Sequence, residues 1–189
     1  MTARLGDNLD QFFDKAFQKI EKQLGFASVL AANEIAKDVV SGLQDQLDKD
    51  IDKPTPFTKR AFKIKRANRK TLSSEVSIKP AQAEYLKYQI KGGTRRNKTV
   101  IIPRKKQTNK YGNLPRGKLK RLSSQGKTYI ANDLIIQRQK RKQKPVAFLT
   151  DKATYKPRFK FFERARSEAK LKANQHVQQS IRKALSTAR

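Results

Sequence analysis

Lysine and arginine side chains are the groups with which this sequence could do chemistry, and they gather in clusters. The chain of 189 residues holds 45 of them against 16 aspartates and glutamates, which gives a net charge of +29. Between Arg95 and Lys144 there are 17 basic residues and one acid, Asp133. Such clusters neutralise phosphates without reading base sequence, pair with the carboxylates of an acidic protein, or stay solvated. The residues that we expect to contact a partner are Arg95, Arg96, Lys98, Arg104, Lys105, Lys106, Arg116, Lys118, Lys120, Arg121, Arg138, Lys140, Arg141, Lys142 and Lys144.

The residues that usually carry catalysis or hold metals are scarce. There is no cysteine, which excludes disulfides and thiolate zinc sites. The one histidine, His176, falls on the polar side of the last predicted helix, where we expect it to be solvated. A magnesium-dependent nuclease needs two or three acids that converge, and few are present after residue 53. These acids are Glu75, Glu84, Asp133, Asp151, Glu163 and Glu168.

Two short motifs resemble pieces of catalytic or nucleotide-binding sites. Glu84 and Lys87 have the spacing of a nuclease fragment, but a helical ion pair has the same spacing, and we adopt that interpretation. Residues 92–94, Gly-Gly-Thr, lack the lysine and serine of a phosphate-binding loop. We therefore predict no enzymatic activity, no catalytic or metal-binding residues and no cofactor.

The charge is divided unevenly along the chain. Residues 1–52 carry six basic and ten acidic side chains, a net −4, whereas residues 53–189 carry 39 and six, a net +33. This asymmetry is typical of a surface for nucleic acid or for an acidic protein. No apolar run approaches the roughly 18 residues of a membrane span, and no signal peptide is evident, so we expect a soluble protein without a membrane partner.

The acidic part of the chain, residues 1–52, has the periodicity of amphipathic helices. Apolar residues recur at helical spacing from Leu9 to Leu24 and again from Val29 to Leu47, which predicts two helices separated by Gly25. An amphipathic helix needs a surface to cover. We expect these helices to lie on a sheet of the same chain, with contact between helices of two subunits as the alternative.

The basic part of the chain has the pattern of a small, mostly antiparallel sheet with insertions. Pro54 and Pro56 mark the boundary with the helices, because neither continues a helix or pairs in a sheet. A hairpin (62–64 with 76–78), a helix (81–90), strands (100–102, 129–136 and 146–149) and a short helix around 114–122 follow. Gly92 and Gly93 end the helix over 81–90. The basic run 137–144 is the tip of a long hairpin or a disordered loop.

The last periodic segment is a helix over 158–185. The predicted fold class is α+β: two N-terminal helices and a long C-terminal helix packed on the small sheet, with long basic loops. The parts are an acidic helical part (1–52), a basic β-rich part with loop insertions (53–157) and the C-terminal helix (158–189), together one domain.

Several short stretches, in this order, resemble a family of structural proteins from tailed bacteriophages. They are Asp52–Ala61 (DKPTPFTKRA), Glu84–Arg96 (EYLKYQIKGGTRR), Tyr111–Lys118 (YGNLPRGK), Pro145–Leu149 (PVAFL) and Tyr155–Phe159 (YKPRF). Proteins of this family are similar to the minor tail protein Z of bacteriophage lambda, which is concerned with tail completion at the head–tail junction.

The resemblance implies a non-enzymatic virion component, assembled in the host cytoplasm as a homo-oligomeric ring at the neck or upper tail. Its partners would be portal, adaptor or tail-tube proteins with acidic surfaces, with packaged DNA as a second contact. The composition supports an alternative almost as well, a sequence-independent nucleic-acid-binding protein of the ribosomal or DNA-packaging type. A nuclease ranks third.

Overall fold

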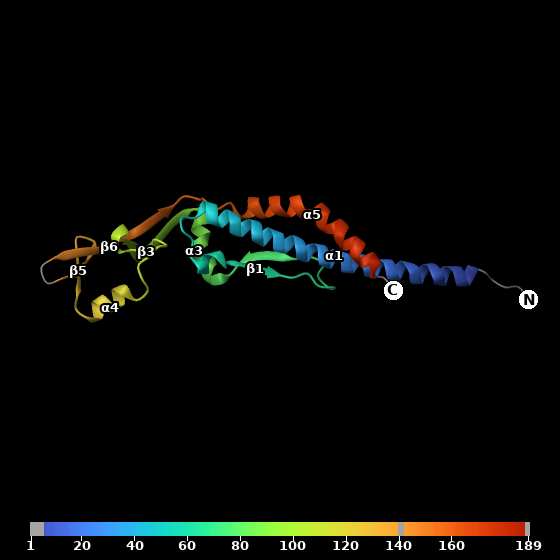
Figure 1. Ribbon diagram of the computed structural model, residues 1–189, viewed down its shortest axis with the longest axis horizontal. Helices are drawn as coiled ribbons and strands as arrows, with labels where there is room; N and C mark the ends of the chain where they lie inside the picture. The colour runs from blue at the N-terminus through green and yellow to red at the C-terminus, as the bar shows by residue number, and fades with distance from the viewer. Residues whose placement is uncertain (1–5, 140–141, 188–189) are drawn as a thin grey trace, which may run out of the picture. The chain divides into compact units, whose positions relative to one another are not determined.

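Helices and antiparallel strands alternate along the chain in the computed structural model, which describes residues 6–139 and 142–187, without the side chains of 6–11 and 97–99 (Figure 1). The elements are α1 (Gly6–Asp50), α2 (Pro56–Lys59), β1 (Phe62–Lys65), β2 (Glu75–Ile78), α3 (Pro80–Lys91), β3 (Gly93–Pro103), the 3-10 helix η1 (Lys105–Gln107), α4 (Lys118–Ser124), β4 (Thr128–Ala131), β5 (Leu134–Arg138), β6 (Gln143–Tyr155) and α5 (Phe161–Ser186). The predicted α+β class and the long C-terminal helix are confirmed.

These elements form two compact units, and each is assembled from segments that are distant in sequence. The helical unit consists of α1 up to Asp45, Phe62–Lys79 and α5. The sheet unit consists of Gln46–Ala61 and Pro80–Lys160. The hairpin β1–β2 therefore belongs with the long helices, and the four remaining strands form a sheet of their own.

The N-terminal region is one helix rather than the two predicted from the sequence. Gly25, which we expected to end the first helix, lies inside α1. A glycine in a helix interior costs only about 1 kcal/mol relative to alanine, and it ends a helix only where the chain turns into the left-handed region. Here Phe26 and Ala27 continue the apolar pattern, and Ala27 is buried. Burial beyond the glycine thus outweighs its conformational cost.

Gly25→Ala is expected to stabilise the protein by about 0.5–1 kcal/mol, because alanine restricts the unfolded chain and favours the helix. A Cβ added at Gly25 meets no atom within 4 Å. Thermal unfolding followed by circular dichroism measures the effect, expected as a rise in Tm of about 1–4 °C. Gly42→Ala is the matched control, because its Cβ would lie 2.6 Å from Cγ of Glu168. An equal rise for both variants would contradict this account.

The helical unit is held together where α1, α5 and the hairpin meet. In the hairpin, Phe62 pairs with Ile78 and Lys65 with Glu75, which confirms the predicted hairpin. Phe62 stacks on Phe161 of α5, with ring centroids 6.2 Å apart. The buried apolar residues of α1 in this unit are Ala27, Ala31, Ala36, Val39 and Leu43. Most are small, as close packing of a helix against its neighbours requires.

The sheet unit is built on a four-stranded antiparallel sheet in the order β3-β6-β5-β4. The segment predicted as one strand over 129–136 is in fact two, β4 and β5, joined by a tight turn. Asn132 and Asp133 form this turn with φ values of 47° and 57°. The pairing of Ala131 with Leu134 leaves only these two residues in the loop.

The basic run 137–144 joins β5 to β6. Arg138 pairs with Gln143, and the backbone N–H groups of Gln139 and Lys142 donate to each other's carbonyls at 3.0 and 3.3 Å. The sequence left two forms open for this run, the tip of a long hairpin or a disordered loop, and the pairing of its described residues is that of a hairpin. Lys140 and Arg141 lie outside the described residues.

Candidate interaction surfaces

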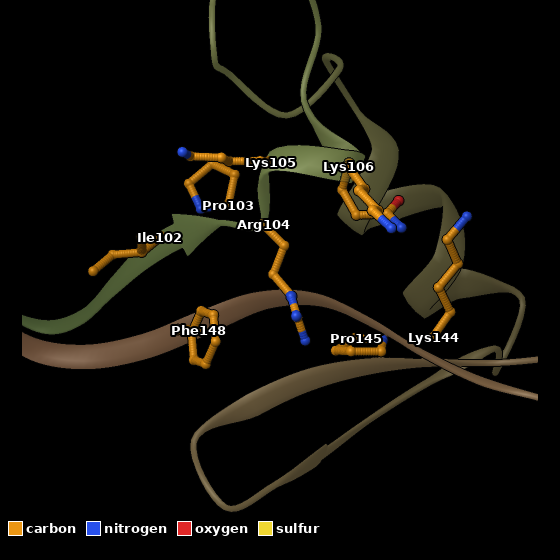
Figure 2. Close-up of a pocket in the computed structure, with 9 residues that line it drawn as sticks. Ile102, Pro103, Arg104, Lys105, Lys106, Lys144, Pro145 and Phe148 are labelled. Carbon is orange, nitrogen blue, oxygen red and sulfur yellow. The ribbon is translucent and has the colours of Figure 1, made fainter.

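An open groove lies in the sheet unit where β3 ends and β6 begins. Because the two strands are antiparallel, the end of one meets the start of the other: Ile102 pairs with Phe148, and the Arg104 N–H donates to the Val146 carbonyl at 3.1 Å. The groove encloses about 520 Å³. It is lined by Ile102, Pro103, Arg104, Lys105, Lys106, Gln107, Lys144, Pro145 and Phe148 (Figure 2).

The groove combines exposed apolar side chains with cations. Ile102 and Phe148 leave 47% and 44% of their surface exposed, although they face each other across two strands. Figure 2 shows Arg104 extended past Phe148 toward Pro145. The Arg104 guanidinium carbon lies 5.6 Å from the centroid of the Phe148 ring. A cation over a ring face is stabilised there and keeps its N–H donors available.

A polar contact next to the groove fixes the turn that carries two of its lysines. Gln107 is buried, and its side-chain oxygen accepts a hydrogen bond from Nζ of Lys118 at 2.7 Å. The Gln107 N–H donates to the Arg104 carbonyl at 2.8 Å. With Gln107 held inside, Lys105 and Lys106 are left exposed on η1. A buried amide is stable only when hydrogen-bonded, so this contact maintains the groove wall.

The structure brings together two of the basic clusters predicted from the sequence. We call the following six residues the basic end of the sheet: Arg104, Lys105, Lys106, Arg138, Lys142 and Lys144. They are close because β6 pairs with β3 on one side and with β5 on the other. Arg138 stands over the Tyr129 ring, 5.0 Å from its centroid, and so repeats the arrangement of Arg104 and Phe148.

The other predicted contact residues lie elsewhere. Arg95 and Arg96 pair with Ala153 and Lys152 near the far end of β3, roughly 26 Å from Arg104 along the strand. Lys120 and Arg121 belong to α4, and Arg116 lies two residues before that helix begins. Lys118 does not line the groove, but its Nζ donates a hydrogen bond to Gln107, which does. The side chain of Lys98, and Lys140 and Arg141, fall outside the described residues.

Two of the four residues predicted as structural boundaries, Pro54 and Pro56, stand between α1 and β1. Pro56 is the first residue of α2, and the preceding Thr55 caps that helix by accepting from the Thr58 N–H at 3.2 Å. Proline suits this position because its missing N–H would have no helical partner. Pro54 lies in the four-residue turn before Thr55.

Gly92 joins α3 to β3, and Gly93 is the first residue of β3. Both have positive φ, 70° and 115°, which other residues rarely adopt. A Cβ on Gly92 would also lie 2.9 Å from Cδ of Pro157. The two glycines thus allow the chain to leave α3 and start β3 directly beside the end of β6.

A second candidate surface is the N-terminal part of α1, in the helical unit. Large apolar side chains recur there at helical spacing and remain more than half exposed: Phe12 and Phe17 at 67%, Phe13 at 53%, Ile20 and Leu24 at 51%. We call these five residues the apolar stripe. The expectation that this part of the helix covers a sheet of the same chain is wrong. Among the described side chains of α1, from Phe12 onward, the first buried residue is Ala27.

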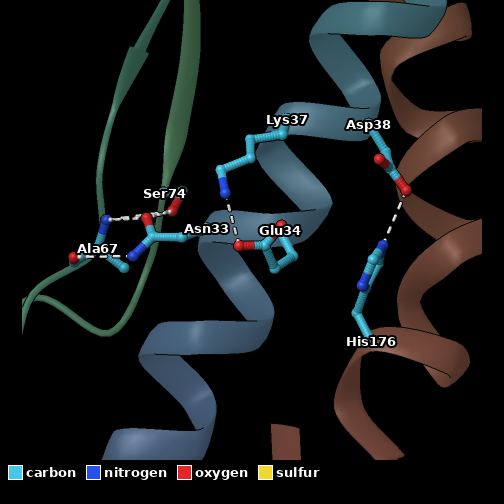
Figure 3. Close-up of polar contacts among 7 residues, drawn as sticks. All are labelled: Asn33, Glu34, Lys37, Asp38, Ala67, Ser74 and His176. Atoms are coloured by element: carbon cyan, nitrogen blue, oxygen red, sulfur yellow. Dashed lines mark hydrogen bonds and ion pairs between the residues drawn. The ribbon is translucent and has the colours of Figure 1, made fainter. Parts of the chain in front are cut away.

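Contacts beyond the apolar stripe fix α1 to the rest of its unit (Figure 3). The Asn33 amide oxygen accepts from the Ala67 N–H at 2.9 Å and its amide nitrogen donates to the Ala67 carbonyl at 3.2 Å. The hydroxyl of Ser74 donates to the same Asn33 oxygen at 2.9 Å. On the other side of α1, Nε2 of His176 is 2.8 Å from a carboxylate oxygen of Asp38.

The position of His176 differs from the prediction that it is solvated. Its side chain is only 14% exposed and lies between α5 and α1 (Figure 3). The sequence placed His176 on the polar side of α5, but the partner on that side is Asp38, 138 residues earlier. Polar residues that face a neighbouring helix form contacts that periodicity within one helix does not reveal.

Asn33→Asp is expected to destabilise the helical unit by about 1–3 kcal/mol. The aspartate carboxylate cannot donate a hydrogen bond to the Ala67 carbonyl, and the carbonyl oxygen would then face a negatively charged oxygen. Chemical unfolding in urea measures the loss. Asn68→Asp is the matched control: the Asn68 oxygen accepts from the N–H groups of Lys70 and Thr71, and aspartate keeps both contacts. Equal losses in the two variants would count against the paired contact.

Neither surface carries a recognisable metal site. Among the described residues, no group of three or more histidine, cysteine, aspartate or glutamate side chains could hold a metal ion. No described helix is both long and apolar enough to cross a membrane. The chain was compared with protein-family models, with curated proteins and with solved structures, and none of them matched.

Proposed function

We propose that this chain is a non-enzymatic structural subunit of a tailed-phage virion, a neck or tail completion protein that forms a ring at the head–tail junction or upper tail. The observation that carries the proposal is the pair of exposed surfaces, the apolar stripe and the groove with its basic end. The stripe alone is as large as the largest apolar patches of monomeric proteins, which are often binding sites. A subunit that binds another macromolecule at each of these surfaces accounts for both.

The stretches that resemble the phage family support the proposal because some of them form one structural cluster in the sheet unit. In the stretch 52–61, Thr58 is buried, and its hydroxyl lies 3.1 Å from the hydroxyl of Tyr85 in the stretch 84–96. These hydroxyls join α2 to α3. Thr58 and Tyr85, which lie in two of the stretches that resemble the phage family, therefore help to pack the fold. Such a role is expected of shared residues in a family of non-enzymatic virion proteins.

A third stretch, 155–159, completes the same cluster. The rings of Tyr88 and Tyr155 lie 5.4 Å apart, and the backbone N–H groups of Arg158 and Phe159 donate to the Gln89 carbonyl at 2.7 and 2.9 Å. Three stretches that are up to 100 residues apart in sequence thus meet around α3. Their order along the chain and their contacts are consistent with one shared fold.

The partners that fit the basic end of the sheet are acidic surfaces of portal, adaptor or tail-tube proteins. Within Pro80–Lys160 there are 23 basic residues and three acids. Lys105, Lys106 and Lys144 are exposed there. Complementary charge gives fast and specific association between proteins that must assemble in order. Packaged DNA is the second partner that this charge would accept.

Analysis of purified particles tests the proposal. Virions made by a phage that encodes this chain are purified by density gradient and examined by mass spectrometry and electron microscopy, beside particles from a strain in which the gene is deleted. We expect the protein at a fixed copy number per tailed particle, and tails that are unfinished or unjoined after deletion. Restoration by the intact gene is the control. Absence of the protein from purified tailed particles would refute the proposal.

A specific observation favours a second candidate function, binding of nucleic acid without sequence preference. Arg104 over Phe148 and Arg138 over Tyr129 place cations beside aromatic faces, an arrangement that suits phosphates and stacked bases. A titration with duplex DNA over a range of salt concentrations separates the two candidates. Micromolar or tighter affinity at about 150 mM salt with a steep salt dependence favours nucleic acid, and weak binding there favours the virion subunit.

A further inference from the structure

We propose that the apolar stripe of one copy docks in the basic groove of a second copy, so that subunits associate head to tail. The inference rests on the proposed ring and specifies which surfaces form its contacts. The occupant of the groove is therefore the start of α1 from a neighbouring chain. Both surfaces expose apolar side chains, and the acidic start of α1 is opposite in charge to the lysines and arginine that line the groove.

The exposed area of the apolar stripe is large enough for a specific contact. At about 200 Å² for a large side chain, the exposed fractions of Phe12, Phe13, Phe17, Ile20 and Leu24 amount to about 600 Å². This area is at the upper end of the range of about 300–600 Å² that the largest apolar patch of a monomer covers. A standard interface buries about 800 Å² on each partner, so the stripe would supply most of the area of one.

The groove offers matching apolar surface. Ile102 and Phe148 are both nearly half exposed and pair across β3 and β6, so they form a continuous apolar floor. A volume of about 520 Å³ is within the range of pockets that take several side chains. Phenylalanine rings such as those of Phe13 and Phe17 suit such a site, because aromatic side chains inserted in pockets dominate binding energy.

Charge favours this pairing over a symmetric one. Residues 7–14, where α1 starts, contain three aspartates and no basic residue, whereas Arg104, Lys105 and Lys144 line the groove. A parallel pairing of two copies of α1 would place the acidic segments together, and any pairing of α1 with α1 would leave the groove uncovered. A contact between two different surfaces of the same chain closes into a ring or continues as a filament.

A mixing experiment tests the inference. The helix variant carries Phe13→Asp and Phe17→Asp, and the groove variant carries Arg104→Glu, Lys105→Glu and Lys144→Glu; all five positions are exposed. Analytical ultracentrifugation measures the state of each. We expect wild-type protein to form species larger than dimers, and each variant alone to associate about 100-fold more weakly. Mixed one to one, the variants should form a heterodimer, because one intact stripe and one intact groove remain.

The control variant carries Lys63→Glu, Lys65→Glu and Lys70→Glu, which reverse three exposed lysines of the helical unit. It should assemble as wild type does. If the groove variant unfolds by circular dichroism, the same three positions changed to glutamine replace it in the mixture. Wild-type protein that stays monomeric at tens of micromolar, or variants that stay monomeric when mixed, would overturn the inference.

This experiment separates the two proposals. If the mixed variants stay monomeric and the protein is nevertheless found in tailed particles, the virion role stands and the assigned contact is wrong. If the mixed variants form a heterodimer and the protein is absent from particles, the contact stands and the virion role is wrong.

Discussion

Phe159→Ala is expected to lower the free energy of unfolding of the protein by about 3–5 kcal/mol. Phe159 is 1% exposed and is the largest of the fully buried side chains. Alanine removes the ring and leaves a cavity, since the surrounding backbone is held in place: the N–H groups of Arg158 and Phe159 both donate to the Gln89 carbonyl. Urea unfolding followed by circular dichroism gives the loss.

Phe57→Ala is the control for this substitution. Phe57 also belongs to the sheet unit but is 52% exposed, so the same chemical change should cost less than about 1 kcal/mol. The difference between the two losses is the informative quantity, because the effect of alanine on the unfolded chain is common to both and cancels. Losses of similar size at the two positions would contradict the assignment of Phe159 to the core.

The importance of Phe159 follows from how α3 ends. The last four carbonyls of a helix have no partner within it, and Gln89 supplies one of these in α3. The segment after β6 satisfies that carbonyl with two N–H groups and then inserts the Phe159 ring. A core residue outside any regular element thus secures the end of a helix nearly 70 positions earlier.

Much of this fold could be predicted from the sequence because its signals are local. The alternation around Ile64 and Val76, the apolar spacing before Gly92 and the long period of α5 each depend on residues within one element. The division at Gly25 was wrong because a glycine has the same local signature inside a helix and at its end. Only the buried residues that follow it, such as Ala27 and Ala31, decide between the two.

The turn between β4 and β5 shows a different limit of sequence patterns. Tight hairpin loops are usually recognised by glycine, and here Asn132 and Asp133 take its place. Both residue types tolerate the left-handed region better than other side chains do. Without a glycine, the apolar residues on either side of them read as one strand.

The candidate groove could be predicted only in part. The sequence identified Arg104–Lys106 and 138–144 as basic clusters, but their proximity depends on the register between β3 and β6, which are joined by 39 residues. The apolar floor of the groove was missed because Ile102 and Phe148 resemble ordinary core residues of strands. The useful signal would have been the closeness of these apolar residues to basic runs, since Arg104 follows two positions after Ile102 and Lys144 precedes Phe148 by four.

Neutralising Lys105, Lys106 and Lys144 with glutamine is expected to weaken binding of a 20-base-pair DNA duplex about 10- to 100-fold at 50 mM salt, where even a protein-binding surface attracts polyanions. Each lysine that neutralises a phosphate adds about 0.9 to the magnitude of the negative slope of log binding constant against log salt concentration. Without the three lysines, the magnitude of this slope should therefore decrease by about 3. Fluorescence anisotropy at several salt concentrations measures both quantities.

The control removes the same charge elsewhere, by changing Lys63, Lys65 and Lys70 to glutamine in the helical unit. If charge acts only through the net +29, the two triple variants should lose affinity equally. If the basic end of the sheet is a contact surface, only the variant with Lys105, Lys106 and Lys144 changed to glutamine should reduce the magnitude of the slope by about 3, because only these lysines displace counterions from the duplex. Equal slopes would therefore show that the residues gathered by β3 and β6 do not act as one surface.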